Sequence, residues 1–139
     1  MSDQLTADRI ALQDVHLRYA AGVDNRDMDM YRSCFADDVE VLGFGEETIH
    51  GAEAWLAYVV EALKRFGPTQ HMLGPQLATV DGDTARTRSD VQALHYMADD
   101  EDTTLTLWAT YESDMRRIDG EWKIFRHRLI PRGNRVQQG

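Results

Sequence analysis

Histidine and tyrosine side chains on the predicted inner faces of two strands are the residues of this chain best suited to chemistry. His95 continues a face of small and apolar residues in a strand predicted over 84–97. Tyr111 lies on the apolar face of the next strand, predicted over 104–117. An imidazole can exchange a proton near neutral pH, and a phenol can donate a hydrogen bond. The pattern therefore predicts polar groups in an apolar interior, where each needs a hydrogen-bond partner.

A second inward histidine precedes these two strands. His71 alternates with Leu73 and Leu77, so its ring is also expected to face inward. Its candidate partner is Asp24, which follows Gly22 near the end of a predicted helix. A lone inward histidine is more often a hydrogen-bonded core residue than a catalyst, and a carboxylate after a helix is most simply a solvated turn residue. Two inward histidines together with a tyrosine favour a functional site.

The remaining polar residues form no competing motif. The five histidines lack the spacing H-E-x-x-H, and the patterns G-x-x-x-x-G-K-[ST], G-x-G-x-x-G and G-x-S-x-G are absent. His16 within a helix and His50 before another helix are predicted to be surface residues. Glu46, Glu47 and the acidic run 99–102 are predicted to be solvated loops. No metal site and no organic cofactor are expected.

Composition narrows the class of protein. The chain has 139 residues, of which 42% are hydrophobic and 28% charged, as in a folded domain. Its net charge of -9 disfavours nucleic acid or an anionic membrane as a partner. The single cysteine, Cys34, is expected to be a buried apolar residue without an internal disulfide, which fits a reducing cytoplasm. No signal peptide and no apolar run of membrane-spanning length are expected.

Three helices are predicted in the first half of the chain. The first covers 6–21, with Thr6 as its N-cap, Ile10 among its apolar positions and Gly22 at its end. A short second helix covers 28–35. The third helix has apolar residues at helical spacing, namely Ala52, Trp55, Leu56, Val59 and Leu63.

From residue 70 onward the apolar pattern changes from the helical to the strand repeat. Glycine-containing turns at 81–83 and 119–120 connect strands, and a last strand is predicted over 122–130. Helices followed by an antiparallel meander are typical of the α+β class. We expect one domain over 1–139, a cone-shaped barrel in which a curved, mostly antiparallel sheet wraps around three helices.

Three short segments of the sequence are distinctive, namely Gly22-Val23-Asp24-Asn25-Arg26, Thr69-Gln70-His71 and the turn Ile118-Asp119-Gly120-Glu121-Trp122-Lys123. They resemble the polyketide cyclase-like, or SnoaL-like, branch of the nuclear transport factor 2-like superfamily. Within that branch the chain is similar to scytalone dehydratase, bile-acid dehydratase and hexachlorocyclohexane dehydrochlorinase. The resemblance implies a cystatin-like fold and a catalytic pair formed by Asp24 and His71. It also implies that His95 faces the ligand from the following strand.

The residues depart from scytalone dehydratase around this pair. Val23 and a glycine near Gly43 stand where that enzyme has two tyrosines, and Ala109 and Tyr111 stand where it has a serine and an asparagine. Scytalone itself is therefore not the expected substrate. The residues expected to contact the substrate are Tyr19, Leu73, Val91, Leu107 and Tyr111.

The resemblance implies a cofactor-independent lyase that eliminates water from a small hydrophobic cyclic molecule. His71 removes a carbon-bound proton, and Asp24 stabilises the imidazolium that forms. Two alternatives remain open: an isomerase of the ketosteroid type, and a non-catalytic domain that binds a small molecule. A homodimer is also expected, formed through the outer face of the sheet, where Trp108 and Thr110 are predicted to be exposed.

Overall fold

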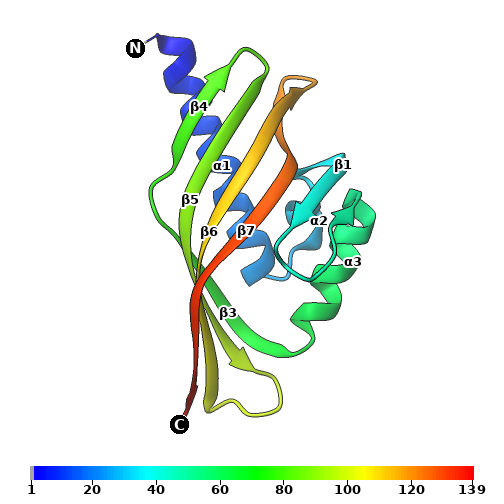
Figure 1. The fold of residues 1–139 in the computed structure, drawn as a ribbon, viewed down its shortest axis with the longest axis vertical. Helices are drawn as coiled ribbons and strands as arrows, with labels where there is room; N and C mark the ends of the chain where they lie inside the picture. Colours follow the sequence, from blue (N-terminus) through cyan, green and yellow to red (C-terminus); the bar gives the residue numbers. More distant parts are fainter. Residues whose placement is uncertain (1) are drawn as a thin grey trace.

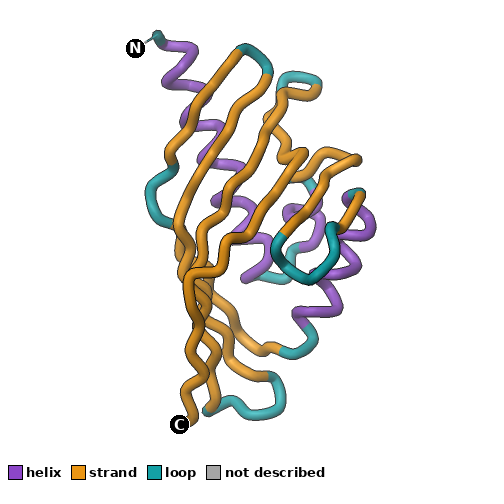
Figure 2. Tube along the Cα trace, in the orientation of Figure 1, coloured by secondary structure: helices purple, strands orange, loops and turns teal. Residues whose placement is uncertain are grey.

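The protein folds into a large sheet with three helices against one side of it (Figures 1 and 2). The structure is a computed structural model, and it describes residues 2–139. The elements follow in the order α1 (Asp3–Asp24), α2 (Met28–Arg32), β1 (Phe35–Leu42), β2 (Ile49–His50), α3 (Ala52–Leu63), β3 (Phe66–Leu73), β4 (Leu77–Asp81), β5 (Thr84–Met97), β6 (Thr103–Ile118) and β7 (Glu121–Gln138). Over the described residues, no helix combines the length and the apolar character needed to cross a bilayer.

The sheet has the strand order β2-β1-β7-β6-β5-β3, and β4 also pairs with β5. Among the described strands, β1 and β7 run parallel and every other pair is antiparallel. The mostly antiparallel α+β fold predicted from the sequence is therefore confirmed. The sheet does not close into a barrel, because β2 and β3 lie at its two edges. In Figure 1, α1 runs behind β5, β6 and β7, and α3 lies to the right of β1 in the view.

The core lies between these helices and the inner face of the sheet. Helix α1 contributes Leu12, Val15, Tyr19 and Val23, which recur at helical spacing and are almost fully buried. Ile10 was expected among the apolar contacts of this helix but is 66% exposed, because its phase places it on the opposite side of α1. Leu12 occupies the buried stripe instead.

Helix α1 is longer at both ends than the sequence predicts. Its N-cap is Ser2 rather than Thr6, since the Ser2 hydroxyl accepts a hydrogen bond from the backbone N–H of Leu5 at 3.0 Å. Gly22 does not end the helix, which continues to Asp24. A side chain at Gly22 would place its Cβ 2.9 Å from the backbone nitrogen of Tyr31. The glycine therefore serves the close packing of α1 on α2.

The strand phases mostly match the prediction. Along β5 the buried residues alternate from Ala85 to Ala93, and the turn glycines Gly82 and Gly120 have positive φ angles of 60° and 82°. Leu77 was expected to face inward but is 67% exposed. The irregular residues 74–76 separate β3 from β4 and shift the phase, so that Ala78 takes the inner side.

The end of one strand and the burial of one helical residue also differ from the prediction. Strand β7 extends to Gln138, eight residues beyond the predicted end, because it keeps its pairing with β6 out to Thr103. In α3, Trp55 and Val59 are buried as predicted, whereas Leu56 is only partly buried at the edge of the core.

Candidate functional site

Asp24 and His71 meet at the end of α1, where β3 passes beside it. The ring nitrogen Nδ1 of His71 lies 2.8 Å from Oδ1 of Asp24, and the backbone N–H of His71 donates to Oδ2 at 2.8 Å. The side chains are 11% and 19% exposed, respectively. A carboxylate accepts but does not donate, so Nδ1 carries the proton and Nε2 is left as the basic nitrogen. Among the described residues Nε2 has no hydrogen-bond partner.

Two further residues hold the Asp24 carboxylate in place. The Thr69 hydroxyl donates to Oδ1 of Asp24 at 3.0 Å. Arg26 donates to that hydroxyl at 2.9 Å, and its other terminal nitrogen donates to the carbonyl of Gly67 at 2.6 Å. Arg26 reaches them because its backbone turns back after α1, with a φ of 55°. Thr69 and Arg26 belong to two of the three segments that carry the family resemblance, but their roles depend on contacts that the sequence does not reveal.

The electrostatics of the pair favour an ionised Asp24. Burial by itself raises the pKa of this carboxyl group, but the hydrogen bonds from His71 and Thr69 outweigh burial and lower the pKa. The carboxylate is therefore charged at neutral pH. Its charge lies where it stabilises a positive His71 ring and fixes the orientation of that ring.

His95 lies next to this pair on β5. Its ring centroid is 5.8 Å from that of His71, at an angle of 79° between the ring planes. Burial lowers the pKa of His95, so the ring is neutral near pH 7. Its Nδ1 lies 3.1 Å from the carbonyl oxygen of Leu105, which can only accept, and Nδ1 therefore carries the proton. The structure thus brings Asp24, His71 and His95 together, with Nε2 of His95 as an acceptor.

Three of the five residues predicted to contact the substrate, Leu73, Val91 and Leu107, lie on the same inner surface of the sheet. His71 pairs across the sheet with Ala93 and then Leu107, and Leu73 pairs with Val91 in the neighbouring row. Val91 is buried, while Leu73 and Leu107 are partly buried against the core. These side chains form an apolar surface beside the imidazole of His71.

Tyr19 and Tyr111 belong to a second polar group deeper in the core. Their rings lie 5.3 Å apart, and both phenols are almost fully buried. Burial raises the pKa of each phenol well above its usual value, so both stay protonated at neutral pH. Among the described residues, neither phenol is hydrogen-bonded to Asp24 or His71.

The prediction that His16 lies at the surface is wrong. Its side chain is 2% exposed and lies on the buried stripe of α1, between Leu12 and Tyr19. Its Nε2 is 3.2 Å from the Ser113 hydroxyl on β6. His16 follows Leu12 by four residues, so a helical repeat counted from Leu12 places it on the buried face of α1. The prediction counted the repeat from Ile10, which lies on the opposite face.

His127 was missed altogether, although it is fully buried. Trp122 and Ile124 set the inner phase of β7, and strict alternation from them would turn His127 outward. The neighbouring residues Asp114 and Met115 pair with Arg126 and Ile124, so β7 carries one extra residue there and its phase reverses. No signal in the sequence marks that bulge.

Neither a metal centre nor a reactive thiol stands out in the described part of the chain. Residues 2–139 contain no group of three or more histidine, cysteine or acidic side chains arranged to hold a metal ion. Cys34 is buried as predicted, and burial raises the pKa of its thiol to about 11. The thiol is therefore protonated and unreactive at neutral pH.

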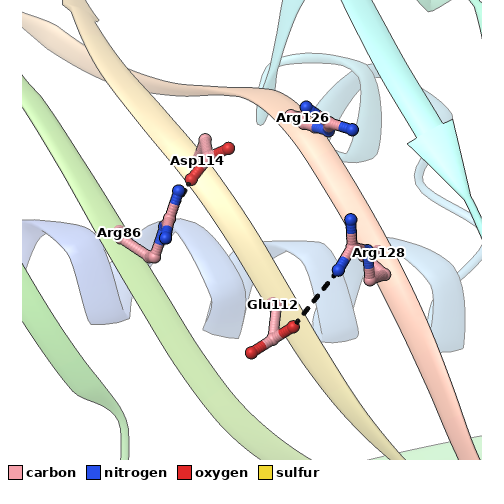
Figure 3. Close-up of a pocket in the computed structure, with 5 residues that line it drawn as sticks. All are labelled: Arg86, Glu112, Asp114, Arg126 and Arg128. Carbon is pink, nitrogen blue, oxygen red and sulfur yellow. Dashed lines mark hydrogen bonds and ion pairs between the residues drawn. The ribbon is translucent and has the colours of Figure 1, made fainter.

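The outer face of the sheet has a shallow depression of about 230 Å³, lined by charged residues (Figure 3). Arg86 pairs with Asp114 at 3.0 Å, and Arg128 lies 3.9 Å from Glu112. The side chains alternate along their strands with the buried residues of the inner face, so this depression is on the side opposite the Asp24–His71 pair. Two of the three arginines here are paired with acidic side chains, and because the depression lies opposite the pair it is not the candidate active site.

On the same outer face, Trp108 and Thr110 differ in their exposure. Trp108 is 39% exposed, as predicted. Thr110 was expected to be exposed as well but is fully buried, because its hydroxyl lies between Asp90 and Arg132 and forms hydrogen bonds with both.

Comparison with known proteins places this geometry in a family. The model of the SnoaL-like domain matches residues 4–128. The uncharacterized protein Rv2910c of Mycobacterium tuberculosis is 29% identical over 124 residues, covering 86% of this chain and 82% of the relative. The hexachlorocyclohexane dehydrochlorinase LinA-type3 from Novosphingobium barchaimii LL02 superposes with a TM-score of 0.87 at 26% identity, covering 99% of this chain and 96% of the other.

A scytalone dehydratase-like protein from Novosphingobium aromaticivorans DSM 12444 has the same fold. It superposes with a TM-score of 0.90 at 21% identity, covering 100% of this chain and 93% of the other. The family match spans almost all of α1, every element from α2 to β6 and the first part of β7, and so includes both residues of the Asp24–His71 pair. The chain belongs to the SnoaL-like domain family.

Proposed function

We propose that the protein is a cofactor-independent lyase in which His71 is the general base. The observation that carries the proposal is the 2.8 Å contact between Nδ1 of His71 and Asp24, which leaves Nε2 as the free basic nitrogen. Similarity to a hexachlorocyclohexane dehydrochlorinase at 26% identity supports an elimination reaction. A pair of this kind has no evident use in a domain that only binds its ligand.

The proposed reaction begins with proton removal from carbon. Nε2 of His71 takes a proton from a carbon next to an activating group, and the positive ring is stabilised by the ionised Asp24. The electrons of the broken C–H bond form a double bond as the leaving group departs. His95 has its acceptor nitrogen near His71, so it is suited to orient the substrate by accepting a hydrogen bond from a substrate hydroxyl.

The surface beside His71 favours a small hydrophobic ring as substrate. Leu73, Val91 and Leu107 offer apolar contact, and few polar groups compete for the ligand. Cyclic hydroxy-ketones are the first class to screen, because loss of water gives a conjugated product with a new ultraviolet absorption. Chlorinated cyclohexanes are the second class, because the dehydrochlorinase similarity points to them.

The test combines this screen with substitutions at the pair. On a substrate found in the screen, His71→Ala is expected to lower turnover by ~10²–10⁴-fold, the usual contribution of a general base. Asp24→Asn keeps the shape but loses the charge, so a large decrease with unchanged folding is also expected. His50→Ala is the matched control, since His50 is an exposed histidine far from the pair in the sheet. Parent-level turnover by a folded His71→Ala variant would refute the assignment.

Mass spectrometry of the product separates the open alternatives. An elimination lowers the mass by one water or one hydrogen chloride, whereas an isomerase leaves the mass unchanged. Thermal stabilisation by compounds that are never converted would indicate a binding domain instead.

A further inference from the structure

Five polar residues form a continuous hydrogen-bonded chain through the core. The hydroxyl of Tyr19 lies 3.0 Å from Nε2 of His127, and Nδ1 of His127 lies 2.9 Å from the Ser113 hydroxyl. The same hydroxyl is 3.2 Å from Nε2 of His16, and Nδ1 of His16 is 2.9 Å from the side-chain nitrogen of Gln76. Tyr19, His127, Ser113 and His16 are each at most 2% exposed. Nothing in the Asp24–His71 chemistry accounts for this chain.

The surroundings of His16 can accommodate either of its two neutral forms, because Nδ1 has both a donor and an acceptor beside it. When Nδ1 is unprotonated it accepts from the amide of Gln76, and when Nδ1 is protonated it donates to the carbonyl oxygen of Leu12 at 3.2 Å. Both histidines stay neutral, because burial lowers the pKa of His16 and lowers that of His127 to about 3.

The hydrogen bonds of this group can therefore all point in either of two directions. In the first, His16 donates to Ser113, Ser113 donates to His127, and His127 donates to Tyr19, which leaves the Tyr19 proton free for another acceptor. In the second, every hydrogen bond is reversed and Tyr19 donates to His127. When one proton leaves Tyr19, one enters His16 at Nδ1 and one shifts along each bond between them, the first arrangement becomes the second and every member of the hydrogen-bonded chain stays neutral.

The two ends of the chain lie in different surroundings. Tyr19 packs against Tyr111, with ring centroids 5.3 Å apart, and it precedes Asp24 on α1 by five residues, ~7.5 Å along the helix axis. At the other end, Gln76 lines a surface depression of about 220 Å³ beside α1. One end of the hydrogen-bonded chain therefore lies in the core near Asp24 along α1, and the other end lies at a surface depression.

The proposed elimination also needs a group that His95 cannot supply. Hydroxide must be protonated as it leaves, but neutral His95 presents an acceptor rather than a donor. Tyr19 holds its proton strongly because it is buried, so it can give the proton up only if another replaces it at once. A relay behind Tyr19 provides that replacement.

We propose that Tyr19, His127, Ser113 and His16 form a proton relay that protonates the leaving group while His71 removes the carbon-bound proton. The relay rests on the proposed lyase function. As the C–O bond breaks with its electron pair on oxygen, Tyr19 gives its proton and water is formed. Tyr19 is reprotonated by His127, His127 by Ser113 and Ser113 by His16, and His16 takes a proton from solvent at Nδ1. His71 later returns its proton to solvent, so the turnover is balanced.

The test compares two buried serines on neighbouring strands. Ser113→Ala interrupts the relay, whereas Ser89→Ala removes a hydroxyl that is equally buried and has no partner in the described structure. With a hydroxylated substrate, Ser113→Ala is expected to lower kcat by ~10²-fold or more with little change in KM, as for loss of a general acid. Ser89→Ala should keep the parent kcat, and Ser113→Thr should recover much of the loss. Tyr19→Phe, which keeps the ring, should reproduce the defect if Ser113→Ala folds poorly.

Nitrogen NMR of the histidine rings gives a readout that needs no substrate. Ser113→Ala should change the populations of the two neutral forms of both His16 and His127, whereas Ser89→Ala should change neither. Unchanged ring populations in Ser113→Ala, or a parent kcat in the folded variant, would overturn the relay. That result leaves the proposed function standing if His71→Ala is inactive, so the two failures can be told apart.

Discussion

The Asp24 carboxylate accepts three hydrogen bonds, two from His71 and one from Thr69. Each bond favours the charged form, and together they overcome the effect of burial on the Asp24 pKa. The Thr69 hydroxyl is oriented toward Asp24 because Arg26 already donates to it. The pair is thus positioned by a polar shell as well as by the chain geometry of α1 and β3.

Replacing Thr69 by valine tests this shell. The change keeps the side-chain shape but removes the donor to Asp24, so the pKa of Asp24 should rise and the His71 ring should lose orientation. We expect kcat to fall about tenfold, equivalent to ~1.4 kcal/mol, with little change in KM. Steady-state kinetics check this, with the exposed Thr79→Val on β4 as the control. Equal kcat values for the two variants would show that the hydroxyl has no role.

At the level of elements, the packing of α1 against α2 determines where Asp24 lies. Gly22 allows the Tyr31 backbone to approach α1, and Asp24 follows two residues later at the end of the helix. The register of β3 with β5 then brings His71 to Ala93 and Thr69 to His95. The site therefore depends on one close helix contact and one strand register.

Gly22→Ala is expected to destabilise the protein despite the better helix propensity of alanine. Alanine in a helix interior gains ~1 kcal/mol over glycine, but its Cβ would meet the Tyr31 backbone, which cannot rotate away. Overpacking of this kind costs about 1–3 kcal/mol, so a net loss of stability is expected. Urea unfolding checks the result, with the exposed Gln13→Ala on α1 as the control. A Gly22→Ala variant more stable than the parent would contradict the close-packing explanation.

At the scale of the whole molecule, buried neutral histidines make stability depend on pH. The pKa values of His16, His95 and His127 are lowered by burial, that of His127 to about 3. In the unfolded chain a histidine has a pKa near ~6.5. Below that pH the unfolded chain binds protons that the native state does not, so stability falls as the pH decreases.

The free energy of unfolding should therefore decrease between pH 7 and pH 5. His127 alone contributes a decrease of about 2 kcal/mol over this interval, from its unfolded pKa and its depressed native pKa. A His127→Leu variant should be less stable at pH 7 but should lose less stability on acidification. Denaturant unfolding at three pH values measures the slopes. If the free energy of unfolding changes equally steeply with pH in the parent and in this variant, His127 is not buried in its neutral form.

The outer face of the sheet is the predicted surface for a homodimer. Trp108 remains a candidate anchor, whereas the burial of Thr110 removes it from that surface. The neighbouring arginine and acidic side chains are arranged in strips of opposite charge, which a second copy could match (Figure 3). Light scattering at micromolar concentration is expected to give a dimer, and Trp108→Glu is expected to give a monomer. A monomeric parent protein would exclude this interface under those conditions.

The sequence by itself determined the fold class and the principal residues of the candidate site. The change of apolar repeat near residue 70 marks helices before an antiparallel sheet, and alternation along β5 correctly placed His95 on the inner face. The GVDNR and TQH segments identified Asp24 and His71, which the structure brings within hydrogen-bond distance. These signals are local, because they depend on the spacing of apolar residues within one element and on short motifs.

The tertiary structure decided those residue positions that the local spacing of apolar residues cannot encode. Gly22 looks like a helix end until the Tyr31 backbone is seen beside it, and the phase of β7 changes at a bulge, so His127 turns inward. The Tyr19–His127–Ser113–His16 chain joins side chains from α1, β6 and β7. Contacts between residues about a hundred positions apart arise only when the helix docks on the sheet, because docking and strand register, rather than any single segment, set the distances between their side chains.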